Sequence, residues 1–303
     1  MSTNGTMNPV LEDSIIAAIH EHWNLGRGVA LRRHGHGMNS ATWLVTTATD
    51  RLVAKAVSSS AAAQFDAGLV VAAVLGAAGM PAGAPFPTLA GAVSVPVEGY
   101  QLALLQYEAG RGIDPRDLDE QWVWGATLAR AHALLRSSPV PSGAQLWHWV
   151  DPDATHLDIE PWIRPAVRSA VARLHALQQE MPLTFGLLHA DPAPEAFLVD
   201  GQGRTAIIDW GAVTWGPLLY DIASARLYAG DDATFANVLA GYLSVLPLQR
   251  EELIALPHFL RFRWAVQADY FARRIQARDV TGLTGPAGNG EGLAAARRFL
   301  IGT

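Results

Sequence analysis

The chain has 303 residues, of which 50% are hydrophobic and 17% are charged. It is long enough for one large domain or two ordinary ones and too apolar to be disordered throughout. The formal net charge of −6, from 22 basic and 28 acidic residues, gives no support to nucleic-acid binding, which usually needs a basic face. The absence of cysteine excludes disulfides and thiolate metal sites.

The N-terminal segment and the most apolar stretch indicate a cytoplasmic protein without a membrane partner. Residues 1–9 are polar and carry no secretory signal. Residues 67–78 form the most apolar stretch, but they are too few to span a bilayer and include glycines. We therefore expect residues 67–78 to form a buried helix. The sequence gives no indication of the oligomeric state.

The first third of the chain predicts a helix followed by strands. Leu11, Ile15 and Ile19 recur at helical spacing and predict a helix over residues 9–23. Strands are predicted at residues 41–47, 51–57, 93–97 and 100–107, with a second helix at 61–78. A glycine followed by a proline ends that second helix.

Two features of this region favour nucleotide binding when they are taken together. Gly35 and Gly37, followed by Asn39 and Ser40, interrupt the strand pattern, and glycines let a backbone approach phosphate oxygens without a Cβ in the way. Lys55 is the only lysine in the chain and lies in an otherwise apolar strand, between two alanines. Each feature alone has a simpler explanation, since such a glycine pair is usually a turn and a lone strand lysine usually faces solvent.

The rest of the chain predicts mostly helices. They are expected at residues 117–136, 161–179, 218–228, 234–246, 257–278 and 292–299. Residues 139–152 predict a loop rich in aromatic residues, and residues 281–292 are flexible by composition.

A predicted hairpin inside this region brings two carboxylates together. The apolar runs 197–199 and 205–208 are separated by Gly201-Gln202-Gly203, which predicts two strands joined by a glycine-containing turn. Asp191 precedes the first strand and Asp209 follows the second, so both would lie at the same end of the ribbon. Either aspartate alone could be a turn or cap residue, but the pair favours work on a metal ion or a transferable proton.

The segments His189-Ala190-Asp191 and Ile208-Asp209-Trp210-Gly211, followed by Gly216 and Asp221, resemble motifs of the kinase-like phosphotransferases. The resemblance is to the aminoglycoside phosphotransferase and choline kinase group. It implies an α+β, protein-kinase-like bilobal fold. A small antiparallel-sheet N-lobe, over residues 1–107, would bind nucleotide. A larger, mostly helical C-lobe, over residues 108–303, would hold the catalytic loop and the substrate pocket.

The same resemblance implies ATP and Mg²⁺ as cofactors and transfer of the γ-phosphoryl group to a hydroxyl of a small molecule. Asp191 would be the catalytic base near that hydroxyl, with His189 in the same catalytic motif, and Asp209 would hold magnesium. Lys55 and the glycine-rich loop would position the phosphates. The hinge residues, whose backbone would pair with adenine, would be Gln106, Tyr107 and Glu108.

Two positions depart from the family pattern. Ala196 stands where the family has a metal-binding Asn, and Gly68 stands where a helix normally offers a Glu to the strand lysine. Glu195 is a candidate for the missing ligand if prolines distort the loop, because in an extended segment it would point away. Asp66 is the nearest acidic residue that could replace the missing Glu as a partner of Lys55. The departures motivate the alternative of a pseudokinase-like binding protein with little transfer activity.

The acceptor stays open among aminoglycoside-, choline- and sugar-like molecules. Four acidic residues could form a pocket for a cation or be merely solvated, and these are Asp158, Glu160, Asp231 and Asp232. Trp264, Gln267 and Tyr270 are candidates for substrate contact, with core packing as the favoured alternative for the aromatics. Two further residues are expected to play supporting roles. His132 is expected to be a buried structural histidine, and Asp221 is expected to bond backbone groups of the catalytic loop or of the helix start.

Overall fold

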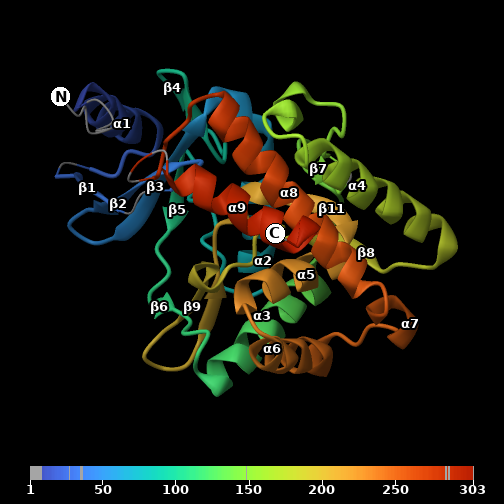
Figure 1. Cartoon of the computed structure of the whole chain (residues 1–303). Coiled ribbons are helices and arrows are strands. Elements are labelled where there is room, and N and C mark those ends of the chain that lie inside the picture. The colour runs from blue at the N-terminus through green and yellow to red at the C-terminus, as the bar shows by residue number, and fades with distance from the viewer. Residues whose placement is uncertain are drawn as a thin grey trace.

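The computed structural model describes residues 9–26, 28–34, 37–147, 149–283, 285 and 287–302. It has an N-lobe built on an antiparallel sheet and a larger, mostly helical C-lobe (Figure 1). The predicted α+β architecture of two unequal lobes is therefore confirmed.

The N-lobe contains a five-stranded antiparallel sheet in the order β1-β2-β3-β5-β4. Its strands are β1 (Ala30–Arg33), β2 (Ala41–Thr46), β3 (Arg51–Ser58), β4 (Val95–Val97) and β5 (Tyr100–Gln106). Helix α1 (Pro9–His22) covers one face, and helix α2 (Ala62–Ala77) packs on the other.

Side-chain alternation along β3 decides where Lys55 points. Ala54 and Ala56 belong to the cluster formed with α1, whereas Val57 packs with residues of α2. Successive side chains of a strand point to opposite faces. Lys55 therefore lies on the same face as Val57, toward α2 and the C-lobe.

Helix α2 belongs to a longer apolar helical segment. Residues Ser59–Ala77 form the one helical segment, among the described residues, that is long and apolar enough to cross a bilayer. This segment extends beyond residues 67–78, the stretch for which the sequence predicted a length too short to span a bilayer. The segment nevertheless contributes Phe65 and Leu69 to the core under the sheet and Val71 and Leu75 to the core of the C-lobe, so it packs as a core helix.

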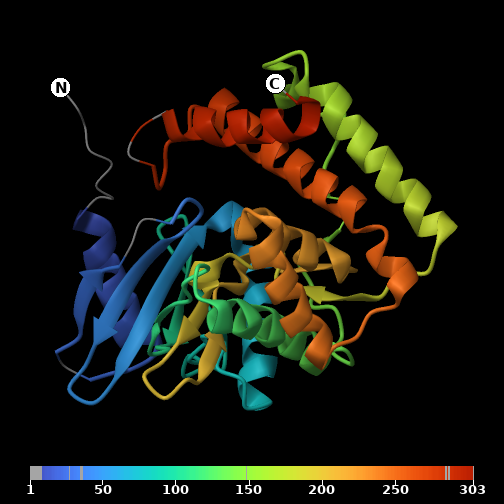
Figure 2. The ribbon, with the colours of Figure 1, turned by 60° about the horizontal axis from the view of Figure 1, so that its bottom comes forward.

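The C-lobe helices run in two groups around α5, with α4, α8 and α9 on one side and α3 and α6 on the other (Figure 2). Their bounds are α3 (Leu118–Leu135), α4 (Ile163–Glu180), α5 (Leu219–Ala229), α6 (Asp232–Val245), α7 (Arg250–Leu253), α8 (Leu256–Gln276) and α9 (Ala287–Ile301). Helix α9 begins five residues before its predicted start, and the short α7 was not predicted. The carboxylate of Asp117 accepts hydrogen bonds from the amides of Asp119 and Glu120 and so caps α3.

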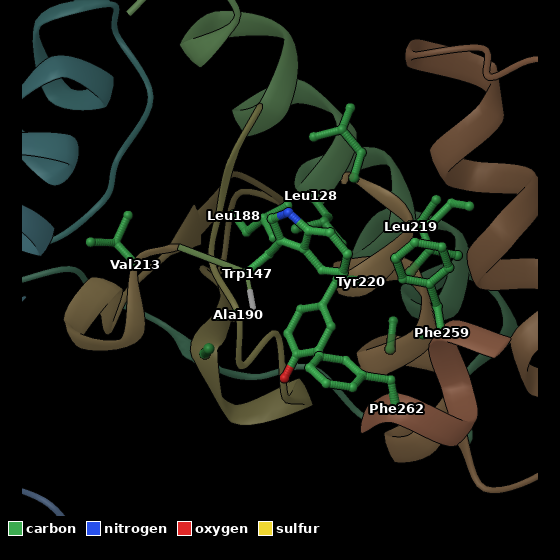
Figure 3. Close-up of a cluster of buried hydrophobic side chains, with 14 of the residues drawn as sticks. Leu128, Trp147, Leu188, Ala190, Val213, Leu219, Tyr220, Phe259 and Phe262 are labelled. Carbon is green, nitrogen blue, oxygen red and sulfur yellow. The ribbon is translucent and has the colours of Figure 1, made fainter. Parts of the chain in front are cut away.

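Buried aromatic and aliphatic side chains from several elements form the C-lobe core. Figure 3 shows Trp147, Tyr220, Phe259 and Phe262 gathered beside the loop that carries Ala190. The ring centroids of Tyr220 and Phe262 lie 5.8 Å apart in an edge-to-face arrangement. The loop that contains Asp191 thus packs, through Ala190, on a cluster of closely packed rings.

Two small three-stranded sheets position the loops of interest. One has the order β10-β9-β6, from β6 (Arg111–Gly112), β9 (Phe197–Val199) and β10 (Thr205–Ile207). The other has the order β7-β11-β8, from β7 (Gln145–Leu146), β8 (Phe185–Leu188) and β11 (Thr214–Pro217). The antiparallel pairing of β9 with β10 confirms the predicted hairpin, whereas the second sheet was not predicted.

Candidate active site

The two predicted carboxylates lie on loops that are tied to each other. Asp191 follows β8 and Asp209 follows β10. The Nε2–H of His189 donates a hydrogen bond of 2.8 Å to the carbonyl of Ile208, so the loop before Asp191 is fastened to the residue before Asp209. The amide of Ile208 in turn donates to the carbonyl of Ala196 over 2.8 Å. These bonds hold the ends of the hairpin together as the sequence predicted.

Asp221 holds the backbone of the catalytic loop. Its carboxylate is fully buried and accepts hydrogen bonds from the amides of His189 and Ala190, at 2.7 and 2.8 Å. Ala190 has φ of +67°, which a residue with a Cβ rarely adopts and which needs such support. The Nε2–H of His132 donates to the same carboxylate over 3.0 Å, and its Nδ1 accepts from Tyr242. The supporting roles predicted for Asp221 and His132 are confirmed.

His189 has no surface to offer a substrate. The residue is 1% exposed, and its ring packs edge-on against Trp210 with centroids 4.8 Å apart. Its Nδ1 is buried and has no hydrogen-bond partner among the described residues. The geometry therefore supports a role in holding the loop instead of direct contact with a reacting group.

Asp209 is paired with the single lysine of the chain. The Nζ of Lys55 makes a short ion pair with Asp209 Oδ1, which joins the N-lobe sheet to the C-lobe hairpin. The charge of Lys55 is the main cause that lowers the pKa of Asp209 below its ordinary value. Asp209 has φ of +68° and its side chain is 57% exposed, whereas that of Lys55 is 11% exposed. The carboxylate is thus accessible to a ligand while it is held by the lysine.

Gly68 replaces the expected Glu with a close helix contact. A Cβ at Gly68 would lie well inside van der Waals distance of the backbone oxygen of Trp210. Any larger residue would push α2 away from the loop that carries Asp209. Asp66 is not the partner of Lys55: its carboxylate accepts a 2.5 Å hydrogen bond from the hydroxyl of Ser94, whereas the Nζ of Lys55 pairs with Asp209. The hypothesis that Asp66 substitutes for the missing Glu is therefore wrong.

The loop around Ala196 is a turn of 3₁₀ helix over Pro194–Ala196. Of the two conformations that the sequence left open, the structure therefore has the one distorted by prolines, and the segment is not extended. Ala196 is buried and offers no oxygen from its side chain, while Glu195 is exposed. Within the ranges that the structure describes, no three His, Asp or Glu side chains form a metal cluster. Magnesium usually binds through one or two carboxylates, substrate phosphates and waters, so the exposed carboxylate of Asp209 fits one such ion.

The glycine-rich loop is held against a C-lobe helix. Gly35 lies outside the described residues. A Cβ at Gly37 would lie 2.8 Å from the carbonyl oxygen of Ser40, so a tight turn requires glycine there. Asn39 Oδ1 accepts a 2.9 Å hydrogen bond from the hydroxyl of Tyr270 on α8. The loop predicted to contact phosphates therefore reaches across to the C-lobe.

The predicted hinge is partly committed to protein contacts. The amide of Gln106 donates to the carbonyl of Ala84 over 2.8 Å, so it is not available to a base. The ring of Tyr107 lies under the guanidinium of Arg51, 4.2 Å from ring centroid to Cζ. Glu108 accepts a 3.1 Å hydrogen bond from the amide of Gly83. Adenine pairing through this segment stays a prediction for the backbone of Tyr107 and Glu108.

Two residues that the sequence did not indicate hold Asp191. The hydroxyl of Tyr228, on α5, donates a short hydrogen bond to Asp191 Oδ1, and Arg263 Nη2, on α8, donates to the same oxygen over 3.2 Å. Arg263 Nη2 also lies 3.1 Å from the Tyr228 oxygen. A polar stripe at helical spacing along α8, Arg263, Gln267, Tyr270 and Arg274, was the available signal.

Burial and neighbouring charges determine the protonation states of Tyr228 and Arg263. Burial raises the pKa of Tyr228 above its ordinary value, although Arg263 opposes that shift. Burial alone would lower the pKa of Arg263, but Tyr228, Tyr220 and Asp191 more than offset it and the pKa is raised. Tyr228 is thus a neutral donor and Arg263 a cation.

The other acceptor candidates are occupied by protein contacts. Asp158 pairs with Arg164 at 2.6 Å, and Glu160 accepts from Trp162 Nε1 at 2.5 Å. Asp231 caps α6 and Asp232 pairs with Arg226. These contacts favour solvated, structural carboxylates over a cation pocket.

Two of the three substrate candidates on α8 contact α9. Trp264 stacks on Phe299 with centroids 5.2 Å apart, and Gln267 donates to the carbonyl of Gly292 over 3.1 Å. The favoured core-packing alternative therefore holds for Trp264, whereas Tyr270 reaches the glycine-rich loop through Asn39.

Comparisons with known proteins identify the family and the fold. A family model described as the phosphotransferase enzyme family matches residues 30–253. A homoserine kinase of Methylobacillus flagellatus is 27% identical over 256 residues, which cover 79% of this chain and 78% of that protein. A solved structure of a microcompartment-associated aminopropanol kinase has a TM-score of 0.74 at 18% identity and covers 96% of this chain and 98% of its own. An amicoumacin kinase, solved in complex with AMP-PNP and Ca²⁺, has a TM-score of 0.74 at 16% identity. The match covers 95% of this chain and 92% of that one.

Proposed function

The chain belongs to the phosphotransferase enzyme family, and on that premise we propose that it is an ATP-dependent kinase for a small molecule. It would move the γ-phosphoryl group of ATP to a hydroxyl of that molecule. Residues 1–107 would form the nucleotide-binding lobe and residues 108–303 the lobe that holds the acceptor. Dependence on ATP also favours a cytoplasmic location.

One observation carries the proposal. The two carboxylates lie on loops fastened by the bond from His189 to Ile208, yet they have different partners. Asp209 pairs with Lys55 of the N-lobe, whereas Asp191 faces α5 and α8 of the C-lobe. Such a division suits a reaction in which one carboxylate serves the nucleotide and the other serves the acceptor.

Bound ATP with magnesium would supply the phosphoryl group and neutralise charge on the phosphates. Lys55 would then turn from Asp209 to the phosphates, and Asp209 would hold the metal, with Glu195 or water completing its coordination. Asp191 would accept a hydrogen bond from the acceptor hydroxyl and take its proton as the new O–P bond forms. The glycine-rich loop with Asn39 and Ser40 would cover the phosphates.

The acceptor is not inherited from the relatives. The relatives reported above are named homoserine kinase, aminopropanol kinase and amicoumacin kinase. The three small molecules in these names differ from one another. Homoserine and amino alcohols therefore join the aminoglycoside-, choline- and sugar-like candidates. The four acidic residues that could have selected a cation are engaged with other protein groups, which argues against a polycation held at those positions.

The alternative is a kinase-fold binding protein with weak transfer activity. Ala196 motivates it, because the second metal ligand of the family is missing. Gly68 no longer supports it, since its contact with Trp210 keeps α2 close to the loop of Asp209 without a Glu.

A coupled assay of ADP release tests the proposal. The wild type is incubated with MgATP and, in turn, homoserine, aminopropanol, choline, an aminoglycoside and a sugar, with Asp191→Asn as the matched control. We expect acceptor-dependent ADP release from one class and at least a hundredfold less from the variant. If MgATP raises the Tm but no acceptor stimulates ADP release, the binding-protein alternative is favoured.

A further inference from the structure

The carboxylate of Asp191 is held by two side chains that come from separate helices. Tyr228 and Arg263 both donate to its Oδ1, and Arg263 also donates to Tyr228, so the three groups close a triangle. We propose that Tyr228 and Arg263 are positioning residues for the transfer reaction, which hold Asp191 so that its other oxygen faces the acceptor hydroxyl. The inference rests on the proposed function, because it assigns Asp191 to the acceptor.

The loop of Asp191 cannot orient this side chain by itself. The five residues that follow it are Pro-Ala-Pro-Glu-Ala, and none of their side chains donates a hydrogen bond when the Glu is ionised. The upstream contacts of the loop, from Asp221 and His189, hold its backbone and not the carboxylate. The donors that fix the carboxylate therefore come from α5 and α8.

The buried guanidinium of Arg263 pairs with this carboxylate through Nη2, whereas its Nε has no hydrogen-bond partner among the described residues. Arg263 is 8% exposed, and a buried charge is costly unless it is paired and hydrogen-bonded. Asp191 is the acidic partner that the guanidinium contacts within the described part of the chain. The side chain of Asp191 is itself 54% exposed. One side of the carboxylate is thus held by the protein, and the other is open to a ligand.

Tyr228 adds direction to that ion pair. Its hydroxyl stays a neutral donor and therefore points its proton at Asp191 while it accepts from Arg263. A carboxylate held by two donors on one oxygen loses the freedom to rotate its second oxygen away from the acceptor. Orientation of this kind contributes to rate because the reacting atoms start close to the productive geometry.

A kinetic mutant cycle tests the positioning role. The variants are Tyr228→Phe, Arg263→Met and Arg263→Lys, each made in the wild type and in Asp191→Asn. We expect kcat to fall about tenfold for Tyr228→Phe and about a hundredfold for Arg263→Met, with partial rescue in Arg263→Lys and little change in the KM for ATP. In the Asp191→Asn background the same changes should have almost no further effect, because the group that they position is already lost.

Two matched controls separate positioning from general damage. Arg226→Met removes an arginine of α5 that pairs with the exposed Asp232, and Tyr100→Phe removes a tyrosine hydroxyl from the N-lobe sheet. Both should keep wild-type kcat. Equal losses of activity in the wild-type and Asp191→Asn backgrounds, or full activity in Arg263→Met and Tyr228→Phe, would overturn the proposal.

A second measurement does not depend on activity. In thermal denaturation, Asp191→Ala should lower Tm in the wild type, because it leaves Arg263 buried without its partner, and should lower it much less in Arg263→Met. If no acceptor stimulates ADP release but this coupling appears, the proposed function fails while the contact stands. Additive Tm shifts would show that Asp191 is not held by Arg263 and would overturn the positioning role by themselves.

Discussion

The two sides of the candidate site, one proposed to bind nucleotide and the other to bind the acceptor, are built in different ways. On the nucleotide side, Lys55 of the N-lobe sheet meets Asp209 of the C-lobe hairpin, so the pair depends on how the lobes sit against each other. On the acceptor side, Asp191, Tyr228 and Arg263 all belong to the C-lobe. The difference teaches that a change between the lobes would alter phosphate binding while the geometry of Asp191 persists. Substitutions should therefore separate into two kinetic classes.

The largest expected effect is on the acceptor side. Asp191→Asn should lower kcat about 10²–10⁴-fold, because the acceptor hydroxyl loses the group that orients it and takes its proton. The affinity for ATP should stay nearly unchanged, since Asp191 does not contact Lys55 or Asp209, the pair proposed to bind the nucleotide. Steady-state kinetics with the true acceptor and nucleotide titration of the variant measure the two quantities. Wild-type turnover in Asp191→Asn would show that the two sides are wrongly assigned.

The next effect is on the nucleotide side. Asp209→Ala should abolish the magnesium-dependent part of ATP binding, because magnesium loses its carboxylate ligand. A ligand at about 100 times its Kd stabilises a protein by about 2.7 kcal/mol, so the loss is visible as a smaller rise in Tm with MgATP than in the wild type. Tm values at a series of ATP concentrations, with magnesium and with EDTA, give the measurement. A folded variant with an unchanged magnesium effect would contradict the assignment.

The close contact between α2 and the loop of Asp209 can be disrupted by a substitution at Gly68. Gly68→Ala should destabilise the protein by about 1–3 kcal/mol, because the new Cβ overlaps the backbone of Trp210. The matched control is Gly290→Ala in α9, where a Cβ meets open space and helix propensity predicts a gain of up to about 1 kcal/mol. Urea denaturation of both variants compares them. Equal stabilities would mean that α2 does not need this close contact.

A smaller effect concerns pH and the pair that joins the lobes. The pKa of Asp209 is lower in the folded protein than its ordinary value, so the pair stabilises the fold above that ordinary value and the benefit is lost as pH falls. The Tm difference between wild type and Lys55→Met should therefore be largest near neutral pH and should shrink toward about pH 3. A difference that is constant with pH would indicate that Lys55 does not stabilise the carboxylate.

The smallest effect is expected in the loop between the two aspartates. If water fills the position of the missing ligand, Glu195→Gln should change the magnesium concentration for half-maximal ATP binding less than about twofold, and Ala196→Asn should lower it. If Glu195 is a ligand, Glu195→Gln should raise that concentration clearly. Should neither variant change it, this loop does not touch the metal, and the binding-protein alternative gains support.

Much of the fold followed from patterns that are local in the chain. Alternation and turn residues predicted the strands of the N-lobe and the hairpin between Asp191 and Asp209, and apolar spacing predicted most of the long helices. The sheet of β7, β11 and β8 was missed because its strands have two to four residues and lie far apart in the chain. They lack the glycine-containing turn that marked the equally short β9 and β10 as a hairpin. The early start of α9 was missed because its first turns contain glycines, which weaken a helix prediction.

For the candidate site, the sequence by itself determined which residues could carry the chemistry. They are the only lysine, Lys55, the two aspartates Asp191 and Asp209, and the neighbouring His189. Only the tertiary structure decided what each of them touches. Tyr228 and Arg263 lie 37 and 72 residues from Asp191, and no local period relates them to it. The physical reason is that secondary structure follows from the order of neighbouring residues. Contacts between helices depend instead on how their packed faces cross, and that is decided only when the core closes.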